Sequence, residues 1–431
     1  MPRLSAVTSR LARRPVTSAD VDWVGVRRVA ARAGVVAACV PVATGLALMA
    51  AERLRRHRHP LDAPFPTAAP ADNTVGATTT TVYTFGDDLY AAMLDAIAGA
   101  RDHVFFETYI WKGDDVGHRF RDALEAAAAR GVEVYVVYDA FANLVVPRSF
   151  FRLDTRIHVL RFPWVRAGAL VSPLRASGRD HRKLLVVDDE LGFVGGYNIG
   201  SLYARHWRDT HVRLAGPAVW ELRNGFVDFW NRWRTPALPV LPDVGSTSWL
   251  PQLRAARNSP SDLVFPIRNV YLDAIDRATS HVQITQAYFI PDREILAALL
   301  DAAARGVDVR VLVPERSNHV VADWLARGHY GTLLRGGVRI FLYADAMIHA
   351  KTATVDGRWS TVGTANIDRL SLTGNYEINL EIVDAGVAAT LEEVFAMDLT
   401  NARELTRAAW EARPTLHKVG ERLVSPLAPF L

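Results

Sequence analysis

The chain contains the sequence His181-Arg-Lys-Leu-Leu-Val-Val-Asp188, which continues at Gly195-Gly-Tyr-Asn198. It contains the same pattern again as His349-Ala-Lys-Thr-Ala-Thr-Val-Asp356, which continues at Gly363-Thr-Ala-Asn366. In both copies the asparagine follows the histidine by 17 positions. Two matching sets of polar residues in the same register indicate a duplicated chain.

The repeat extends beyond these two motifs. Asp209 follows the first histidine by 28 positions, and Glu377 follows the second by 28. Earlier in each half, Ala-Ala-Arg130-Gly-Val-Glu-Val returns 175 positions later as Ala-Ala-Arg305-Gly-Val-Asp-Val. The duplication therefore covers most of the chain.

Apolar periodicity predicts the same order of elements in each half. Helical spacing alternates with short β-branched runs, which is typical of mixed or parallel sheets covered by helices. The predicted order is helix over 90–99, strand over 103–109, helix over 120–130 and strand over 132–138, and it recurs around 271–313. We expect an α/β fold of two duplicated halves, each a mixed β-sheet flanked by helices.

Composition divides the chain into five segments. An Arg-rich beginning, a stretch rich in Pro, Ala and Thr, and Pro-rich sequence between the two halves mark the boundaries. The predicted segments are a basic N-terminal segment over 1–58, a linker over 59–81, the first half over 82–245, the second half over 246–411 and a C-terminal tail over 412–431.

The positive charge is concentrated at the N-terminus. Of the formal net charge of +4, residues 1–60 contribute +8, because they hold 11 Arg against three acidic residues. The rest of the chain therefore carries −4, the difference between these two values, which disfavours a nucleic-acid partner. A basic segment beside an apolar run suits anionic lipid headgroups.

An apolar run covers residues 33–51, and its 19 positions without a charge are just enough to span a bilayer. Arginines flank it on both sides, so the run predicts membrane association. A re-entrant or interfacial segment and a buried core helix are the alternatives. The only cysteine, Cys39, lies inside this run, so neither a disulfide framework nor a thiolate metal site is expected.

The repeated residues suit the chemistry of a phosphodiester. A neutral imidazole can attack phosphorus, and a second one can donate a proton to the leaving oxygen and later accept one. Lysine and asparagine donate to non-bridging oxygens. A carboxylate behind each imidazole, the role given to Asp209 and Glu377, fixes its tautomer. No metal is expected, because His-x-Lys lacks a further His or Cys at zinc spacing.

Both motifs are expected on strands, because aliphatic or β-branched residues follow each histidine. The two-residue period of a strand places His181 and Lys183 on one face. The same period directs Asp188 and Asp356 away from that face, which favours a structural role for these two members of the motif.

His-x-Lys-x4-Asp followed by x6-Gly-(Gly/Ser/Thr)-x-Asn, present twice, resembles the phospholipase D superfamily. Within it the chain most resembles bacterial cardiolipin synthases, through Arg179-Asp-His-Arg-Lys183, Trp207-Arg-Asp209 and Ile348-His-Ala-Lys351. The resemblance implies an active site at the pseudo-two-fold interface between the halves. It also implies a phosphohistidine mechanism that needs no metal or other cofactor.

The resemblance assigns roles to individual residues. The catalytic motifs comprise His181, Lys183, Asp188, His349, Lys351 and Asp356. The phosphate-binding residues are Lys183, Asn198, Lys351 and Asn366, and the residues that orient the histidines are Asp209 and Glu377. In similar enzymes the N-terminal histidine is usually the nucleophile, so His181 is expected to attack phosphorus and His349 to serve as acid and base.

Together these features predict a cardiolipin synthase-like phosphatidyltransferase that acts on phosphatidylglycerol, an anionic phospholipid, at a bacterial cell membrane. A phospholipase D hydrolase would use the same residues and is the nearest alternative. The charge of the body disfavours a nuclease of the same superfamily, and the two complete motifs disfavour a non-catalytic lipid-binding scaffold. The phosphatidyl donor and acceptor, the membrane face and the oligomeric state stay open.

Overall fold

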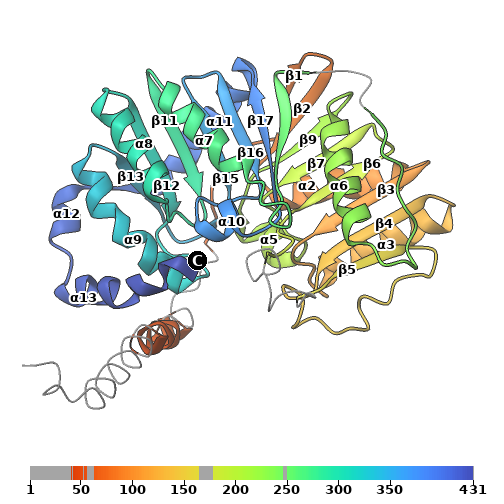
Figure 1. The fold of residues 1–431 in the computed structure, drawn as a ribbon, viewed down its shortest axis with the longest axis horizontal. Helices are drawn as coiled ribbons and strands as arrows, with labels where there is room; N and C mark the ends of the chain where they lie inside the picture. Colours follow the sequence, from red (N-terminus) through yellow and green to blue (C-terminus); the bar gives the residue numbers. More distant parts are fainter. Residues whose placement is uncertain are drawn as a thin grey trace, which may run out of the picture.

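The computed structural model describes residues 40, 42–51, 53–55, 63–164, 178–245 and 250–430. Two halves lie side by side (Figure 1). The first half has strands β1 (Ala71–Val75), β2 (Thr78–Tyr83), β3 (His103–Thr108), β4 (Glu133–Asp139), β5 (His158–Phe162), β6 (Leu184–Val187), β7 (Leu191–Gly195), β8 (Trp207–Arg208) and β9 (His211–Ala215). Its helices are α2 (Gly86–Gly99), α3 (Asp115–Ala129), α5 (Ser201–Arg205) and α6 (Val219–Trp233).

The second half repeats this order and adds helices. Its strands are β10 (Leu253–Asn258), β11 (His281–Gln286), β12 (Asp308–Pro314), β13 (Arg339–Tyr343), β14 (Met347–Ile348), β15 (Lys351–Val355), β16 (Trp359–Gly363), β17 (Glu377–Val383) and β18 (Ala402–Leu405). Its helices are α7 (Pro266–Arg277), α8 (Arg293–Ala304), α9 (Val320–Arg335), α10 (Arg369–Thr373), α11 (Ala385–Leu399), α12 (Arg407–Glu411) and α13 (Thr415–Val424), followed by the 3-10 helix η2 (Ser425–Phe430).

Each half contains an eight-stranded sheet, and the two sheets have matching topology. The strand orders are β1-β2-β9-β7-β6-β3-β4-β5 and β10-β17-β16-β15-β11-β12-β13-β18. The run from β2 to β5 corresponds strand by strand to the run from β10 to β13, while β1 and β18 are extra edge strands. In both sheets the pairing is parallel on one side of β3 or β11 and antiparallel on the other. The predicted α/β fold of two duplicated halves with mixed sheets is confirmed.

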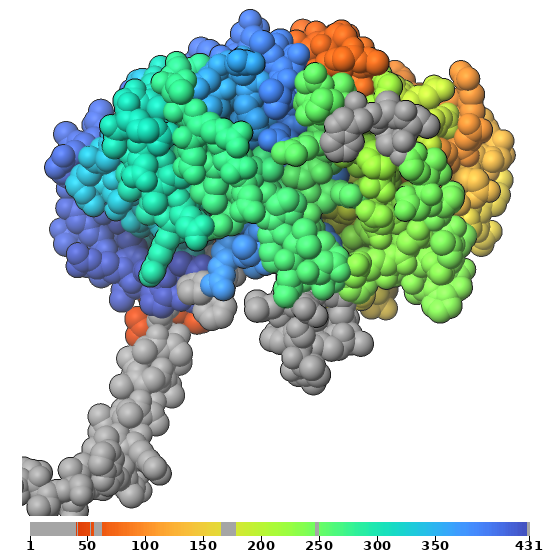
Figure 2. Space-filling view, turned by 45° about the horizontal axis from the view of Figure 1, so that its top comes forward, coloured from red at the N-terminus to blue at the C-terminus, as the bar shows by residue number. Residues whose placement is uncertain are grey.

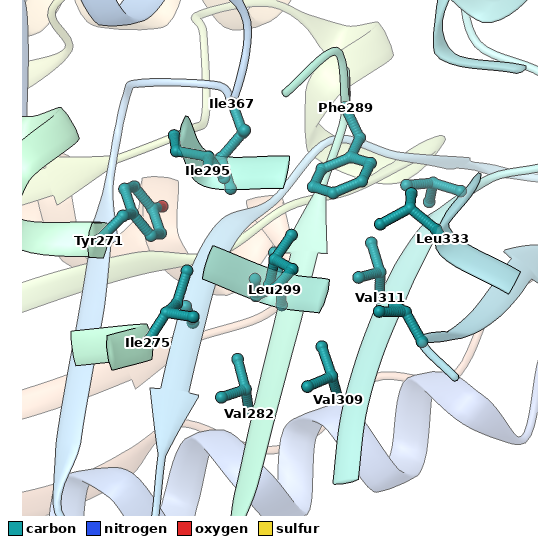
Figure 3. Close-up of a cluster of buried hydrophobic side chains, with 14 of the residues drawn as sticks. Tyr271, Ile275, Val282, Phe289, Ile295, Leu299, Val309, Val311, Leu333 and Ile367 are labelled. Atoms are coloured by element: carbon teal, nitrogen blue, oxygen red, sulfur yellow. The ribbon is translucent and has the colours of Figure 1, made fainter. Parts of the chain in front are cut away.

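Helices cover the outer face of each sheet. In the first half, α2 and α3 pack on β3 and β4 through a core that includes Leu89, Phe106 and Phe120. In the second half, α7, α8 and α9 cover β11 and β12, where Leu299 of α8 lies over the strand residues Val282 and Val309 (Figure 3). These two cores support the sheets from outside and leave the inner faces for contact between the halves.

A third core joins the two halves at their seam. It contains Val194 and Val212 from the first sheet and Val362 and Leu380 from the second. In addition, α6 of the first half packs against β10, and α11 of the second half packs against β1 and β2. Separation of the halves would expose this apolar core, so they form one body.

The linker expected over 59–81 is wrong in its C-terminal part, because its last residues form the hairpin of β1 and β2. Threonine lacks the apolar alternation of a half-buried strand, yet it is β-branched and favours strands. Its hydroxyl is satisfied inside the hairpin, where Thr81 Oγ1 donates to Asp72 Oδ1 at 2.5 Å. Figure 2 shows the hairpin in orange beside the blue second half, and Asn73 Nδ2 donates to Thr390 Oγ1 of α11 at 3.0 Å.

The tail expected over 412–431 also belongs to the fold, because α13 and η2 occupy it. α13 packs on α9. Gly420 makes this contact close, since a Cβ at that position would lie 2.6 Å from the Trp324 ring. The sequence concealed the helix because Leu416, Val419 and Leu423 are exposed, and of its large apolar residues only Val424 is buried in the core.

The apolar run over 33–51 is described in part, since residues 33–39 lie outside the described residues. Residues 42–51 are helical. Leu48 packs against the core of the second half, whereas Leu46 and Met49 are exposed. Among the residues that the structure describes, no helix is both long enough and apolar enough to cross a bilayer.

Replacing Val75 by alanine tests whether the hairpin is part of the fold. Val75 is 1% exposed and belongs to the core at the seam, so Val75→Ala should lower the free energy of unfolding by about 1–3 kcal/mol. The control Thr74→Ala, on the exposed side of β1, should change it by less than about 0.5 kcal/mol. Urea denaturation measures both, and values near zero for both variants would restore the linker interpretation.

Candidate active site

The two motif histidines are each paired with a carboxylate from the opposite half. His181 Nδ1 lies 2.9 and 3.0 Å from the two carboxylate oxygens of Glu377. His349 Nδ1 lies 2.6 Å from Asp209 Oδ2. The sequence left open which carboxylate pairs with which histidine. In the structure each histidine pairs with the carboxylate of the other half. Because each carboxylate occupies Nδ1, each imidazole is left with Nε2 for chemistry.

Backbone hydrogen bonds across the seam hold these pairs in register. His181 N donates to the carbonyl of Tyr376 at 3.0 Å, and His349 N donates to the carbonyl of Arg208 at 2.6 Å. In both cases the acceptor residue directly precedes the carboxylate that the histidine uses. Short parallel pairing between β8 and β14 supports the second contact. Neither half can therefore assemble a complete histidine–carboxylate pair by itself.

The two motif lysines are buried beside the histidines. Lys183 Nζ donates to the carbonyl of His181 at 2.5 Å, and Lys351 Nζ donates to the carbonyl of His349. Burial lowers the pKa of Lys183 to about 7 and that of Lys351 to about 8. Both cations thus sit in an environment that favours loss of their protons, and an anionic phosphate would stabilise the charged forms.

The imidazoles are held neutral when no substrate is bound. Burial lowers the pKa of His181. Burial and the neighbouring Lys351 lower the pKa of His349 to about 3. Burial alone would raise the pKa values of Asp209 and Glu377, but the adjacent histidines and lysines outweigh it and hold both carboxyl groups below their ordinary pKa. When both lysines are protonated, the site therefore combines two carboxylates, two ammonium groups and two uncharged imidazoles.

The asparagines of the motifs lie in the same buried region. Asn198 Oδ1 accepts a hydrogen bond from Ile110 N at 3.2 Å, which fixes the amide plane. Asn366 Oδ1 is buried and has no hydrogen-bond partner among the described residues. The oxygen and nitrogen of a side-chain amide are told apart only by their surroundings. If the two atoms of Asn366 were exchanged, its NH₂ group would occupy the unpartnered position and could donate to a phosphate oxygen.

The two halves of the site differ beside the carboxylates. Thr364 Oγ1 donates to Glu377 Oε2 at 2.5 Å. The equivalent residue of the first half is Gly196, where a Cβ would lie 2.0 Å from Asp209 Oδ1. Glu377 thus shares its negative charge with a hydroxyl, whereas no side chain can stand in that place beside Asp209. The two histidines consequently have different acceptors despite their matching positions.

The aspartates of the motifs lie away from the histidines, which corrects their inclusion among the catalytic residues. The Asp188 carboxylate accepts from the backbone N–H groups of Arg101, Asp102 and His103 at 2.8–2.9 Å. Asp356 accepts in the same way from the turn that precedes β11, at 2.8–3.0 Å. Both residues have positive φ at the end of the motif strand. They fix the turn before the neighbouring strand, and their carboxylates point away from His181 and His349.

Several residues of the site were missed at the sequence level. The Tyr109 ring lies edge-on to His181 with centroids 4.6 Å apart, and the Trp207 ring lies 5.0 Å from His349. Tyr288, which lies one position beyond the counterpart of Tyr109, approaches His349 at 6.3 Å. Tyr109 is the first residue after β3 and Tyr288 the second after β11, and this shift of one position hides them from a residue-by-residue comparison of the halves.

Replacing Lys183 by methionine should stabilise the fold. The pKa of about 7, below the ordinary 10.5, means that the charged lysine opposes folding at pH 7 and below. Lys183→Met should therefore raise the free energy of unfolding by on the order of 1 kcal/mol at pH 7, and the difference should shrink as the pH rises toward about 10. Denaturation at several pH values measures it, and a less stable variant at pH 7 would contradict this account of the buried cation.

Comparison with known proteins agrees with this geometry. The family "Cardiolipin synthase, PLD-like domain" matches residues 93–230 and 271–399, one match in each half. The major cardiolipin synthase of Bacillus subtilis (strain 168) is 34% identical over 366 residues, which are 81% of this chain and 75% of that protein. Cardiolipin synthase A of Pseudomonas putida is 35% identical over 356 residues, which are 80% and 74% of the two chains.

Solved structures share the fold at lower identity. Phosphatidylserine synthase of Haemophilus influenzae Rd KW20 superposes with a TM-score of 0.65 at 13% identity, over 84% of this chain and 95% of that one. Polyphosphate kinase of Porphyromonas gingivalis superposes with a TM-score of 0.52 at 14% identity, over 82% and 53%. These two likenesses concern the fold alone. With the family match in both halves and relatives above 30% identity, the chain belongs to the cardiolipin synthase family of PLD-like proteins.

Proposed function

We propose that the chain is a phosphatidyltransferase that converts two molecules of phosphatidylglycerol into cardiolipin and glycerol through a phosphohistidine. The observation that carries this proposal is the crosswise pair of histidine–carboxylate contacts between two buried lysines. The relatives named as cardiolipin synthases supply the choice of lipid. The protein needs no metal in this scheme, because lysines and amides neutralise the phosphate.

In the first step His181 Nε2 attacks the phosphorus of one phosphatidylglycerol. An N–P bond forms while the bond from phosphorus to the headgroup glycerol oxygen breaks. His349 donates a proton to that oxygen, and glycerol leaves. The phosphodiester adds one negative charge to a site whose two carboxylates and two ammonium groups balance, so its arrival favours the protonated form of His349 that this step requires.

In the second step a hydroxyl of another phosphatidylglycerol headgroup attacks the phosphorus. Its proton passes to His349, the N–P bond breaks, and cardiolipin leaves with both histidines restored. Lys183 and Lys351 neutralise the non-bridging oxygens in both steps. Burial of these groups supports transfer over hydrolysis, because water competes poorly for a phosphohistidine in a closed site.

The asymmetry of the carboxylates supports His181 as the nucleophile. Glu377 Oε2 is shared between His181 and the Thr364 hydroxyl, so it stabilises an imidazolium less than it would without the hydroxyl. Asp209 also accepts a second hydrogen bond, from Thr210 N at 2.7 Å, but on its other oxygen. Asp209 makes the shorter contact, 2.6 Å, with His349. His349, which has the stronger acceptor, suits the acid and base role, in which the imidazole carries a positive charge. His181 suits attack on phosphorus as a neutral imidazole.

We also place the protein at the bacterial cell membrane. A phospholipid substrate requires contact with a lipid surface, and the basic N-terminal segment suits anionic headgroups. The helix over 42–51 exposes large apolar side chains in support of this location.

Product analysis tests the reaction. Purified protein mixed with phosphatidylglycerol in detergent micelles should release cardiolipin and glycerol in equal amounts, because each transfer frees one headgroup. His181→Ala and His349→Ala should each lower the rate by at least about a thousandfold. Release of phosphatidic acid without cardiolipin would show that the protein is a hydrolase.

An activated substrate separates the two histidines. Phosphatidyl-p-nitrophenol needs no proton on its leaving group, so His349→Ala should still release one equivalent of nitrophenol in a rapid burst. His181→Ala should release none. The reverse pattern would assign the attack on phosphorus to His349.

A further inference from the structure

α13 carries a stripe of apolar side chains that faces away from the protein. Leu416, Val419 and Leu423 are 78%, 45% and 38% exposed. Their spacing of three and four positions places them on one side of the helix. The helix contacts the fold through other positions, since Gly420 lies against Trp324. A surface helix normally buries its apolar side, so this stripe needs another partner.

Cations border the stripe. Arg422 follows Val419 by three positions, and Lys418 lies one helical turn before Arg422. These two residues line a depression of about 430 Å³ together with Arg327 and Arg335 of α9. The depression is therefore rich in positive charge and opens next to an apolar surface.

The acidic residues of this depression are already paired. Glu421 pairs at 2.7 Å with Arg413, which also lines the depression, and Glu411 pairs at 2.7 Å with Arg407 outside it. Lys418 Nζ donates to the Glu411 carbonyl at 2.9 Å, a contact that leaves its charge unneutralised. These pairs leave Arg327, Arg335, Lys418 and Arg422 as an excess of positive charge. Such an excess beside apolar side chains complements an anionic lipid surface, in which phosphates lie next to acyl chains.

α13 is connected through η2 to one of the two helices that follow the motif asparagines. Leu202 of α5 and Leu370 of α10 are 44% and 41% exposed. Each follows the asparagine of its half by four positions, so the pair flanks the site symmetrically. η2 continues α13 and packs against α10, and Figure 1 shows α10 and α5 at the junction of the two halves with α13 at the lower left.

The N-terminal helix adds to this surface. It contacts the C-terminal elements, since a Cβ at Gly45 would lie 3.7 Å from both Val321 and Leu427. Its Leu46 and Met49 are exposed as well. Further exposed apolar side chains thus belong to the segment that the charge pattern already associates with lipids.

We propose that α13 is an interfacial helix that binds an anionic bilayer surface. Leu416, Val419 and Leu423 enter the level of the acyl chains, while Lys418 and Arg422 contact lipid phosphates. Docking through this helix turns the active site toward the membrane, where the lipids enter beside Leu202 and Leu370. The inference rests on the proposed function in taking phosphatidylglycerol as the anionic lipid.

A single fluorescent label tests the insertion of α13. Cys39 is the only cysteine, so Cys39→Ser allows an environment-sensitive dye at Val419→Cys, with His181→Ala included to keep the lipids unchanged. With vesicles of phosphatidylglycerol and phosphatidylcholine in equal parts, the dye should brighten, shift to the blue and be quenched by acyl-chain spin labels. A dye at Thr74→Cys, exposed on β1, should do neither.

Two results of this labelling experiment would overturn the proposal. One is a dye at position 419 that stays in water while the protein sediments with the vesicles. The other is a protein that does not sediment with them at all.

Surface variants separate this proposal from the reaction itself. Leu416→Gln/Val419→Gln/Leu423→Gln should weaken partition into the same vesicles by at least about tenfold. Lys418→Gln/Arg422→Gln should weaken it by roughly fivefold per charge at low salt. Both variants should convert a water-soluble, short-chain phosphatidylglycerol at the unsubstituted rate, because the residues lie outside the site.

The outcomes are distinguishable from failure of the proposed function. If the unsubstituted chain forms no cardiolipin from the short-chain lipid, the proposed reaction fails. If it forms cardiolipin and the apolar variant still partitions like the unsubstituted chain, the role of α13 fails. A shift from dimer to monomer in light scattering, with unchanged partition, would assign the stripe to a second copy of the chain.

Discussion

The site depends on histidine–carboxylate contacts that cross between the halves. His181 pairs with Glu377 and His349 pairs with Asp209. The backbone N–H of each histidine also donates to the backbone carbonyl of the residue before its carboxylate partner. The apolar core at the seam and the crossing helices α6 and α11 hold the halves in the position that these contacts require. The duplication thus supplies more than two copies of a motif, because each copy completes the other.

In the proposed reaction, the charges of the site allow one pair of similar histidines to perform two tasks. Two carboxylates balance two ammonium groups, and burial keeps both imidazoles neutral in the resting protein. A phosphodiester shifts this balance by one negative charge, which favours a proton on one imidazole. Thr364 beside Glu377 and Gly196 beside Asp209 make the two sides unequal. The proton is therefore expected on His349, whose acceptor is shared with no side-chain hydroxyl.

The spacing of the motifs was sufficient to predict the strands β6 and β15, the duplicated α/β fold and the set of residues at the seam. The crosswise pairing could not be predicted, because a spacing of 28 positions is the same for both halves and does not specify a partner. The β1–β2 hairpin was not predicted, because its threonine-rich sequence lacks apolar alternation. α13 was not predicted, because most of its apolar residues are exposed and give no core-facing pattern. A buried ion pair at 2.8 Å joins Arg208 and Asp398, which are 190 positions apart in the sequence. No local sequence pattern predicted it.

Side-chain NMR of ¹⁵N-labelled histidine in the Glu377→Gln and Asp209→Asn variants tests the crosswise pairing most directly. We expect Glu377→Gln to change the nitrogen shifts and the tautomer of His181 and to leave those of His349 nearly unchanged. We expect the converse for Asp209→Asn, with His181→Ala and His349→Ala used to assign the signals. Perturbation of His349 by Glu377→Gln, and of His181 by Asp209→Asn, would show that each half serves its own histidine and would contradict the account.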